Sequence, residues 1–135
     1  MLGKARTMKL LFDTHALFWF LDGDPKLSES ARQAISAPDV SLVASAVSAW
    51  EFANKARIGK WPEVQRFAER FTEYAQDQQI ALLSVSAEHA RHAGLMPGDH
   101  RDPFDRMLAA QSEIEQMPLV TADPVFRVFG TKTIW

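Results

Sequence analysis

One stretch near the start of the chain decides the fold: Lys9-Leu10-Leu11-Phe12-Asp13-Thr14-His15. Its three apolar residues stand between a lysine and a carboxylate, which is typical of a short strand buried on both faces of a parallel sheet. Ligands of such sheets bind beyond the carboxyl ends of the strands. Asp13 therefore stands where a functional group is expected, although capping of the next helix, predicted over 16–21, explains an Asp at this position equally well.

The composition describes an ordinary globular protein. The chain has 135 residues, 47% hydrophobic and 24% charged, which suffices for one domain with a buried core. It contains no run of about 18 apolar residues that would span a membrane, and its basic start lacks the apolar segment of a secretory signal. Residues 1–7 are expected to form a disordered extension before a domain over 8–135, with Met8 a candidate for the natural start.

The net charge and the absence of cysteine limit the classes of function that the protein can have. The absence of cysteine excludes disulfides, thiol catalysis and zinc sites built on Cys, and it fits the reducing cytoplasm in which we expect the protein. The formal net charge of −2 is not the basic balance that often marks a nucleic-acid binder. Contact with RNA or DNA would therefore need local Lys and Arg groups or a bound metal ion.

Strand and helix signals alternate along the rest of the chain. Strands are predicted over 40–44, 80–85 and 118–121, with a final edge strand over 132–135. Helices are predicted over 27–35, 49–58, 62–75 and 87–94, and from 103 onwards. This alternation predicts a three-layer α/β domain with a mainly parallel central sheet.

Four carboxylates fall at matching places on this map. Asp13 ends the first strand, Glu51 lies in the first turn of the helix after the second strand, Asp105 lies in the first turn of the helix that starts at 103, and Asp123 follows the fourth strand by two residues. The ends of parallel strands and the starts of the helices that follow them share one edge of the sheet. We therefore expect the first, second and fourth of these groups to lie together, and Asp105 to reach the same edge.

Such a cluster favours a divalent cation. Converging carboxylates repel one another and raise each other's pKa values, so the cluster persists at low cost only when a cation compensates it. Oxygen-only ligands favour Mg²⁺ or Mn²⁺ over zinc, and these ions promote attack on phosphodiesters. The residues therefore predict nuclease chemistry.

Each carboxylate also has a structural explanation. Asp102 is the predicted N-cap of the helix that starts at 103, which leaves Asp105 for the cleft. Glu51 suits the dipole of a helix's first turn, and Asp123 belongs to an Asp-Pro pair that is common in turns. Each signal is weak alone, and only their joint placement favours a site.

Four segments resemble those of a known family. They are Leu11-Phe12-Asp13-Thr14-His15; Ser45-Ala46-Val47-Ser48-Ala49-Trp50-Glu51 with Lys55 and Gly59-Lys60; Asp102-Pro103-Phe104-Asp105-Arg106-Met107-Leu108-Ala109-Ala110-Gln111; and Leu119-Val120-Thr121-Ala122-Asp123. From about residue 8 to the C-terminus the chain resembles the PIN-domain family, and within it the VapC-type toxins of bacterial toxin–antitoxin systems. The second and third segments are the most specific, and no acidic position departs from the pattern.

The resemblance implies a Mg²⁺- or Mn²⁺-dependent endoribonuclease with an α/β/α PIN-like fold, commonly dimeric and held inactive by a cognate antitoxin. By position it assigns catalysis and metal binding to Asp13, Glu51, Asp105 and Asp123. It also places the Thr14 hydroxyl in a hydrogen bond near the metal. Family members are associated with tRNA and other structured RNAs, which are therefore the expected substrates.

The basic residues near the four carboxylates each have two explanations. Lys55, Arg57 and Lys60 form a patch that would steer an RNA backbone, or they are the solvated face of a helix. Arg106 faces either a phosphate or the rim of the core.

The sequence also predicts where three histidines and one hydrophobic segment lie. His89 and His92 share a helix face without a third ligand and are expected at the surface, and His15 is expected to pack or to cap. The run 16–21 is hydrophobic nearly all round, so part of it is expected to face a second copy or the antitoxin.

Three alternatives are considered. A phosphoryl-transfer receiver would need adjacent acidic residues after the first strand, and a haloacid-dehalogenase-like phosphatase would need a second Asp where His15 stands. Both are disfavoured. A non-catalytic binding protein, with carboxylates that only cap helices, is left open, and a lack of metal-linked stabilisation would support it.

Overall fold

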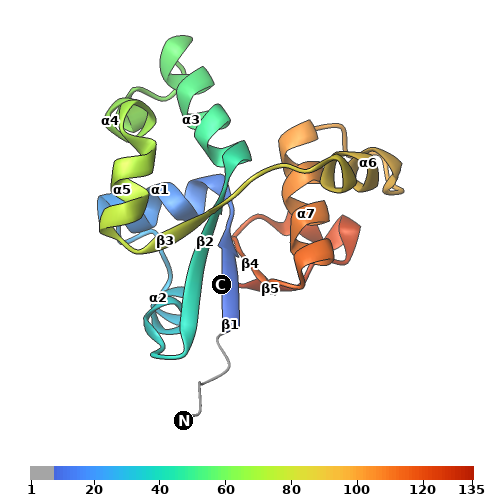
Figure 1. Ribbon diagram of the computed structural model, residues 1–135, viewed down its shortest axis with the longest axis horizontal. Helices are drawn as coiled ribbons and strands as arrows, with labels where there is room; N and C mark the ends of the chain where they lie inside the picture. Colours follow the sequence, from blue (N-terminus) through green and yellow to red (C-terminus); the bar gives the residue numbers. More distant parts are fainter. Residues whose placement is uncertain (1–7) are drawn as a thin grey trace.

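A five-stranded parallel sheet forms the centre of the structure, a computed structural model that describes residues 8–135. The strands are β1 (Met8–Phe12), β2 (Val40–Ser45), β3 (Ile80–Leu83), β4 (Leu119–Val120) and β5 (Thr133–Ile134). They lie in the order β3-β2-β1-β4-β5, and every neighbouring pair is parallel (Figure 1). The predicted extension over 1–7 lies outside the described residues.

Helices cover both faces of this sheet, which confirms the three-layer α/β/α architecture. One face carries α1 (Thr14–Asp22), α2 (Glu29–Ser36), most of α3 (Ala46–Arg57), η1 (Pro62–Val64), α4 (Gln65–Glu69) and α5 (Phe71–Asp77); the other carries α6 (Ala87–Leu95), α7 (Pro103–Glu115) and η2 (Pro124–Phe129) (Figure 1). β1 supplies side chains to both hydrophobic cores. Leu10 and Phe12 pack into the first core and Leu11 into the second, and all three are fully buried, as predicted for a central strand.

α3 begins earlier than predicted. The chain passes from β2 into α3 without a loop, because Ser45 is both the last residue of the strand and the N-cap of the helix; its hydroxyl accepts a hydrogen bond from the Val47 amide at 3.0 Å. Glu51 is therefore in the second turn of α3, and its placement in the first turn was wrong. Similarly, β4 ends at Val120, one residue before the predicted end, so Asp123 follows it by three residues.

The helix predicted over 62–75 is broken. Arg70, at φ −129° and ψ 40°, separates α4 from α5, and a 3₁₀ turn precedes both. The apolar stripe nevertheless faces the core, since Val64, Phe67 and Ala75 are buried. Periodicity therefore predicted the buried face correctly but missed the break in the backbone.

His89 is not at the surface. Its side chain is only 3% exposed, and its Nδ1 accepts a hydrogen bond from the Ser86 amide at 3.0 Å while the Ser86 hydroxyl accepts one from the His89 amide. This is a capping box with His in place of the usual Glu or Gln. The surface prediction was wrong for His89, because the pattern of the cap was not recognised.

The hydrophobic run 16–21 is covered mainly by the chain itself. Its first three residues are buried, and Trp19, Phe20 and Leu21 are half-buried. Phe20 stacks on Phe12 at 5.3 Å between ring centroids, and Trp19 lies 5.5 Å from Trp135. The partly exposed surface of Trp19, Phe20 and Leu21 is smaller than the pattern predicted, and its contact with a second copy or the antitoxin stays a prediction. Large exposed hydrophobic side chains occur elsewhere, as at Trp50, which is 54% exposed.

Candidate active site

Asp13 is both a helix cap and a buried carboxylate at the carboxyl end of β1. Its Oδ1 accepts a hydrogen bond from the Ala16 amide at 2.7 Å, and its Oδ2 accepts one from the Thr121 hydroxyl. The side chain is 7% exposed. The Thr121 Oγ1 also accepts a hydrogen bond from the Asp123 amide at 3.0 Å, so one hydroxyl connects Asp13 to the backbone of Asp123. Sequence reasoning gave Thr121 no role.

Burial raises the pKa of Asp13 to about 6. The hydrogen bonds from Thr121 and Ala16 lower this pKa, and the negative charges of Asp123 and Asp105 raise it further. Asp105 and Asp123 are thus close enough to repel Asp13. Topology predicted that Asp13, Glu51 and Asp123 would lie together and that Asp105 would reach them, but Glu51 is not among the charges that shift the pKa of Asp13.

Asp105 lies in the first turn of α7, as predicted, and Asp102 caps that helix. The Asp102 Oδ1 accepts hydrogen bonds from the amides of Phe104 at 2.8 Å and Asp105 at 3.3 Å. Burial raises the pKa of Asp105, and the charges of Asp102 and Asp123 raise it further. A hydrogen bond to His100, at 2.8 Å between Nε2 and Oδ2, lowers it. Sequence reasoning did not connect His100 with Asp105.

Glu51 and Asp123 have partners of their own. The Glu51 carboxylate lies 3.4 Å from the Lys55 ammonium, one turn further along α3. Asp123 is exposed and caps η2, because its Oδ1 accepts a hydrogen bond from the Val125 amide at 3.0 Å. The structural explanations for Asp13, Asp102 and Asp123 are therefore correct, and they do not exclude a further role.

The carboxylates fit a hard divalent cation by their chemistry but not as a preformed cage. Within residues 8–135, no three His, Asp or Glu side chains converge into a group that could hold a metal ion. The donors at the sheet edge are nevertheless carboxylate oxygens, which Mg²⁺ and Mn²⁺ prefer. Because neighbouring negative charges raise the pKa values of Asp13 and Asp105, a cation among these carboxylates would relieve their repulsion.

Two of the predicted substrate-binding residues, Thr14 and Arg106, contact other parts of the protein. Thr14 is buried, and its hydroxyl lies 2.9 Å from that of Ser48, which joins α1 to α3. The guanidinium of Arg106 donates to the backbone carbonyl oxygens of Ala93 at 2.9 Å, His100 at 2.8 Å, and Met96. These contacts favour the rim of the core, rather than a phosphate, as the place of Arg106.

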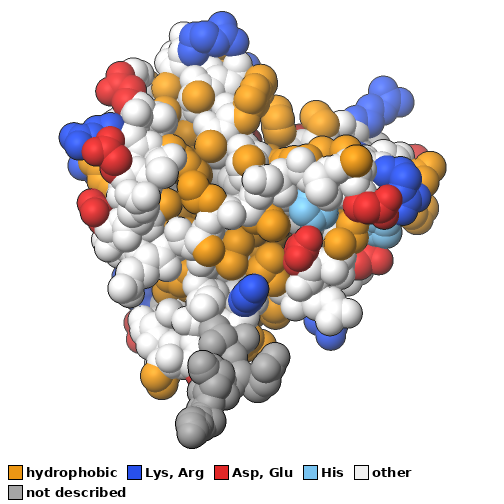
Figure 2. Space-filling view, in the orientation of Figure 1, with side chains coloured by type: hydrophobic (Ala, Val, Ile, Leu, Met, Phe, Trp, Pro, Cys, Tyr) orange, Lys and Arg blue, Asp and Glu red, His pale blue; other side chains and the backbone are white. Residues whose placement is uncertain are grey.

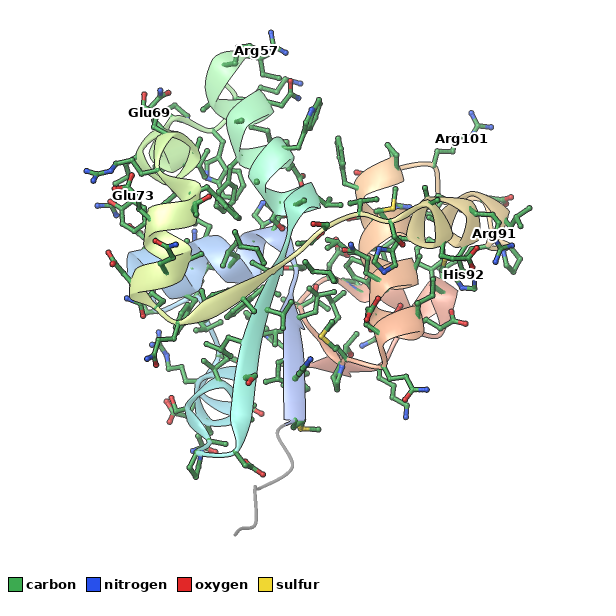
Figure 3. The ribbon with its side chains drawn as sticks, viewed as in Figure 1. Arg57, Glu69, Glu73, Arg91, His92 and Arg101 are labelled. Carbon is green, nitrogen blue, oxygen red and sulfur yellow. The ribbon has the colours of Figure 1, made fainter. Side chains whose placement is uncertain are left out.

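The basic patch does not form one surface. Lys55 and Lys60 line a groove of about 510 Å³ together with His15 and Trp61, whose rings stack at 4.6 Å between centroids. Burial lowers the pKa of His15, which packs as predicted. Arg57 stands at the far tip of α3, away from the sheet (Figure 3). In Figure 2, charged side chains gather mainly at the outer edges of the view, while hydrophobic ones lie along α3 and towards α6.

The model of the PIN domain matches residues 10–132 of the chain. The chain belongs to the PIN-domain family. Among solved structures, a chain of VapBC2 from Rickettsia felis bound to a promoter DNA fragment is similar at a TM-score of 0.67 and 14% identity, covering 93% of this chain and 96% of that one. VapC20 from Mycobacterium tuberculosis, a toxin that cleaves the sarcin-ricin loop, is similar at 0.65 and 15%, with coverage of 90% and 95%.

A third PIN-fold relative is a chain of VapBC-1 from nontypeable Haemophilus influenzae. It has a TM-score of 0.64 and 19% identity, and the match covers 93% of this chain and 96% of that one. At such identities the likeness shows a shared fold. No curated protein sequence matches the chain. None of the helices described in residues 8–135 has the length and apolar character needed to cross a membrane.

Proposed function

We propose that the protein is a Mg²⁺- or Mn²⁺-dependent endoribonuclease that acts in the cytoplasm as the toxin of a toxin–antitoxin pair. The observation that carries this proposal is the buried carboxylate at the end of β1 in a PIN-domain chain: Asp13 has its pKa raised to about 6, partly by two other acidic side chains. Such a group of carboxylates is costly without a compensating cation. The VapC20 toxin and the chains of VapBC complexes among its structural neighbours support the toxin assignment.

Asp13 and Asp105 are the residues we assign to direct contact with the metal, and Glu51 and Asp123 complete the set. The bound cation would supply charge compensation at the phosphate and lower the pKa of an attacking water. Hydrolysis joins that water oxygen to phosphorus, breaks one bond from phosphorus to a ribose oxygen, and leaves a proton on the departing oxygen.

The chain's own side chains prepare this site. Thr121 fixes one oxygen of Asp13, and the hydrogen bond from the Ala16 amide fixes the other. The hydroxyl pair of Thr14 and Ser48 holds the starts of α1 and α3 together; Asp13 caps α1, and Glu51 lies on α3. Lys55 is placed to meet an RNA phosphate next to Glu51.

The partners proposed for this protein are an RNA substrate, a cognate antitoxin and a second copy of the chain. tRNA and other structured RNAs are the substrates we would test first, because RNA is recognised mainly by shape and by its unpaired segments.

The deciding experiment incubates antitoxin-free protein with total tRNA and Mg²⁺ or Mn²⁺, next to Asp13→Asn and a sample with EDTA. We expect cleavage that needs both the metal and Asp13. Equal cleavage by the wild type and Asp13→Asn would contradict the assignment of Asp13. If neither protein cleaves the RNA, the next measurement is a titration of both with Mn²⁺. Equal Mn²⁺ binding by the wild type and Asp13→Asn would contradict the assignment of Asp13 to a metal site and favour a non-catalytic binding protein.

A further inference from the structure

His100 stands on the loop between α6 and α7, next to a carboxylate of the proposed site. Its Nε2 lies 2.8 Å from the Oδ2 of Asp105, and both side chains are about one-quarter exposed. No residue within 8–135 forms a hydrogen bond to the other oxygen of Asp105, Oδ1. His100 therefore holds one oxygen of Asp105 and leaves the second one available for a ligand.

The position of His100 is fixed by two further contacts. Arg106 donates a hydrogen bond to the His100 carbonyl oxygen at 2.8 Å, which anchors the backbone of the loop. The His100 ring meets the ring of Phe129 edge-on, at 5.8 Å and 70°, and the Arg106 guanidinium lies 5.5 Å from the centroid of the same Phe129 ring. Both the backbone and the imidazole of His100 are thus held from outside the acidic cluster.

A second His–carboxylate pair, between α6 and α7, serves as a comparison. The Nε2 of His92 on α6 lies 3.1 Å from Glu113 on α7. His92 faces α7 and lies far from the sheet (Figure 3). Glu113 is not one of the four proposed ligands, and this pair has a close N–O distance but no hydrogen bond to His92 Nε2, so it resembles the first pair in residue types only.

We propose that His100 is a positioning residue that orients Asp105 for the divalent cation, an inference that rests on the proposed function. Carboxylate ligands of metal ions are usually oriented by a hydrogen bond to their other oxygen, and loss of such a partner typically weakens metal binding 10- to 100-fold. The contacts of His100 with Asp105, Arg106 and Phe129 supply this orientation.

The test measures Mn²⁺ affinity by calorimetry and by the metal-dependent rise in melting temperature, without substrate. His100→Phe keeps an aromatic ring against Phe129 and removes the donor, whereas His100→Gln keeps an amide N–H near the place of Nε2. His92→Phe is the matched control. We expect His100→Phe to bind Mn²⁺ about 10- to 100-fold more weakly than wild type, and His100→Gln and His92→Phe to stay within about threefold of it.

Several results would overturn the proposal. Unchanged or tighter Mn²⁺ binding by His100→Phe would mean that His100 is dispensable or competes with the cation. If His100→Gln bound Mn²⁺ as weakly as His100→Phe, the hydrogen bond to Asp105 would not be the cause of the loss. Melting in EDTA shows whether His100→Phe is folded; if it is not, His100→Asn, whose amide is too short to reach Asp105, replaces it with the same expected loss. If the wild type binds no Mn²⁺, the proposed function fails as well; if only Asp13→Asn loses binding, this inference alone fails.

Discussion

Asp13 carries an electrostatic cost that should be measurable in the metal-free protein. Its pKa is about 6 in the folded protein and about 3.8 in an ordinary environment, so the folded state holds this proton more tightly than the unfolded state does. Folding stability therefore decreases as the pH rises from about 4 to about 6, and the full cost applies above pH 6. Two pH units correspond to roughly 3 kcal/mol.

Asp13→Asn should remove this cost, because the amide oxygen can still accept the hydrogen bond from the Ala16 amide. In EDTA at pH 8, we expect the variant to unfold with a free energy up to about 3 kcal/mol higher than that of wild type. The difference should vanish below about pH 4. Urea unfolding across this pH range is the measurement, and a pH-independent difference would contradict the raised pKa.

Thr121→Val tests the hydroxyl that joins Asp13 and Asp123. Loss of the hydrogen bond that lowers the Asp13 pKa should move that pKa above about 6 and shift the pH midpoint of Mn²⁺ binding upward. Thr121→Ser keeps a hydroxyl and is the control. A midpoint that is the same in Thr121→Val and Thr121→Ser would show that the hydroxyl does not stabilise the carboxylate.

At the scale of secondary-structure elements, Arg106 connects α6, the loop after it and α7. Arg106→Lys keeps the positive charge but loses the planar guanidinium group that donates to three carbonyl oxygens at once. We expect a stability loss of about 2–4 kcal/mol together with weaker Mn²⁺ binding through His100. A variant with unchanged melting temperature but impaired RNA binding would instead assign Arg106 to a phosphate.

The sequence predicted many elements because their signals are local. β1 contains an uninterrupted apolar run, and the cap Asp102 was recognised from its own residue type; it accepts hydrogen bonds from the first amides of α7. The start of α3 was missed because Ser45 serves a strand and a helix at once. His100 and Thr121 were missed because their partners lie on other elements, and a single sequence does not show such contacts.

The arrangement of the four carboxylates could be predicted from the sequence only in part. The ends of β1 and β4 and the start of α7 bring Asp123 close enough to raise the pKa values of Asp13 and Asp105. The partners of each carboxylate were not foreseeable, because Lys55, His100 and Thr121 acquire their roles from side-chain packing. The roles of the four carboxylates in metal binding remain predictions.

For the whole molecule, a net charge of −2 limits the electrostatic contribution to RNA binding. If Lys55 and Lys60 supply the phosphate contacts, two charges are neutralised, and affinity for single-stranded RNA should fall less than about tenfold between 50 and 200 mM salt. Asp13→Asn allows binding to be measured without cleavage. A much steeper fall would require basic contacts from a second chain or from residues other than these two lysines.

The hydrogen bond between Thr121 and Asp13 spans 108 positions of the sequence. During synthesis, a chain that has emerged only as far as α7 contains Asp13, Glu51 and Asp105 but neither Thr121 nor Asp123, and β1 still lacks its neighbour β4. The acidic site can therefore be assembled only when nearly all of the protein has left the ribosome. A ribonuclease built in this way would acquire its complete set of carboxylates only when its own messenger had been almost fully translated.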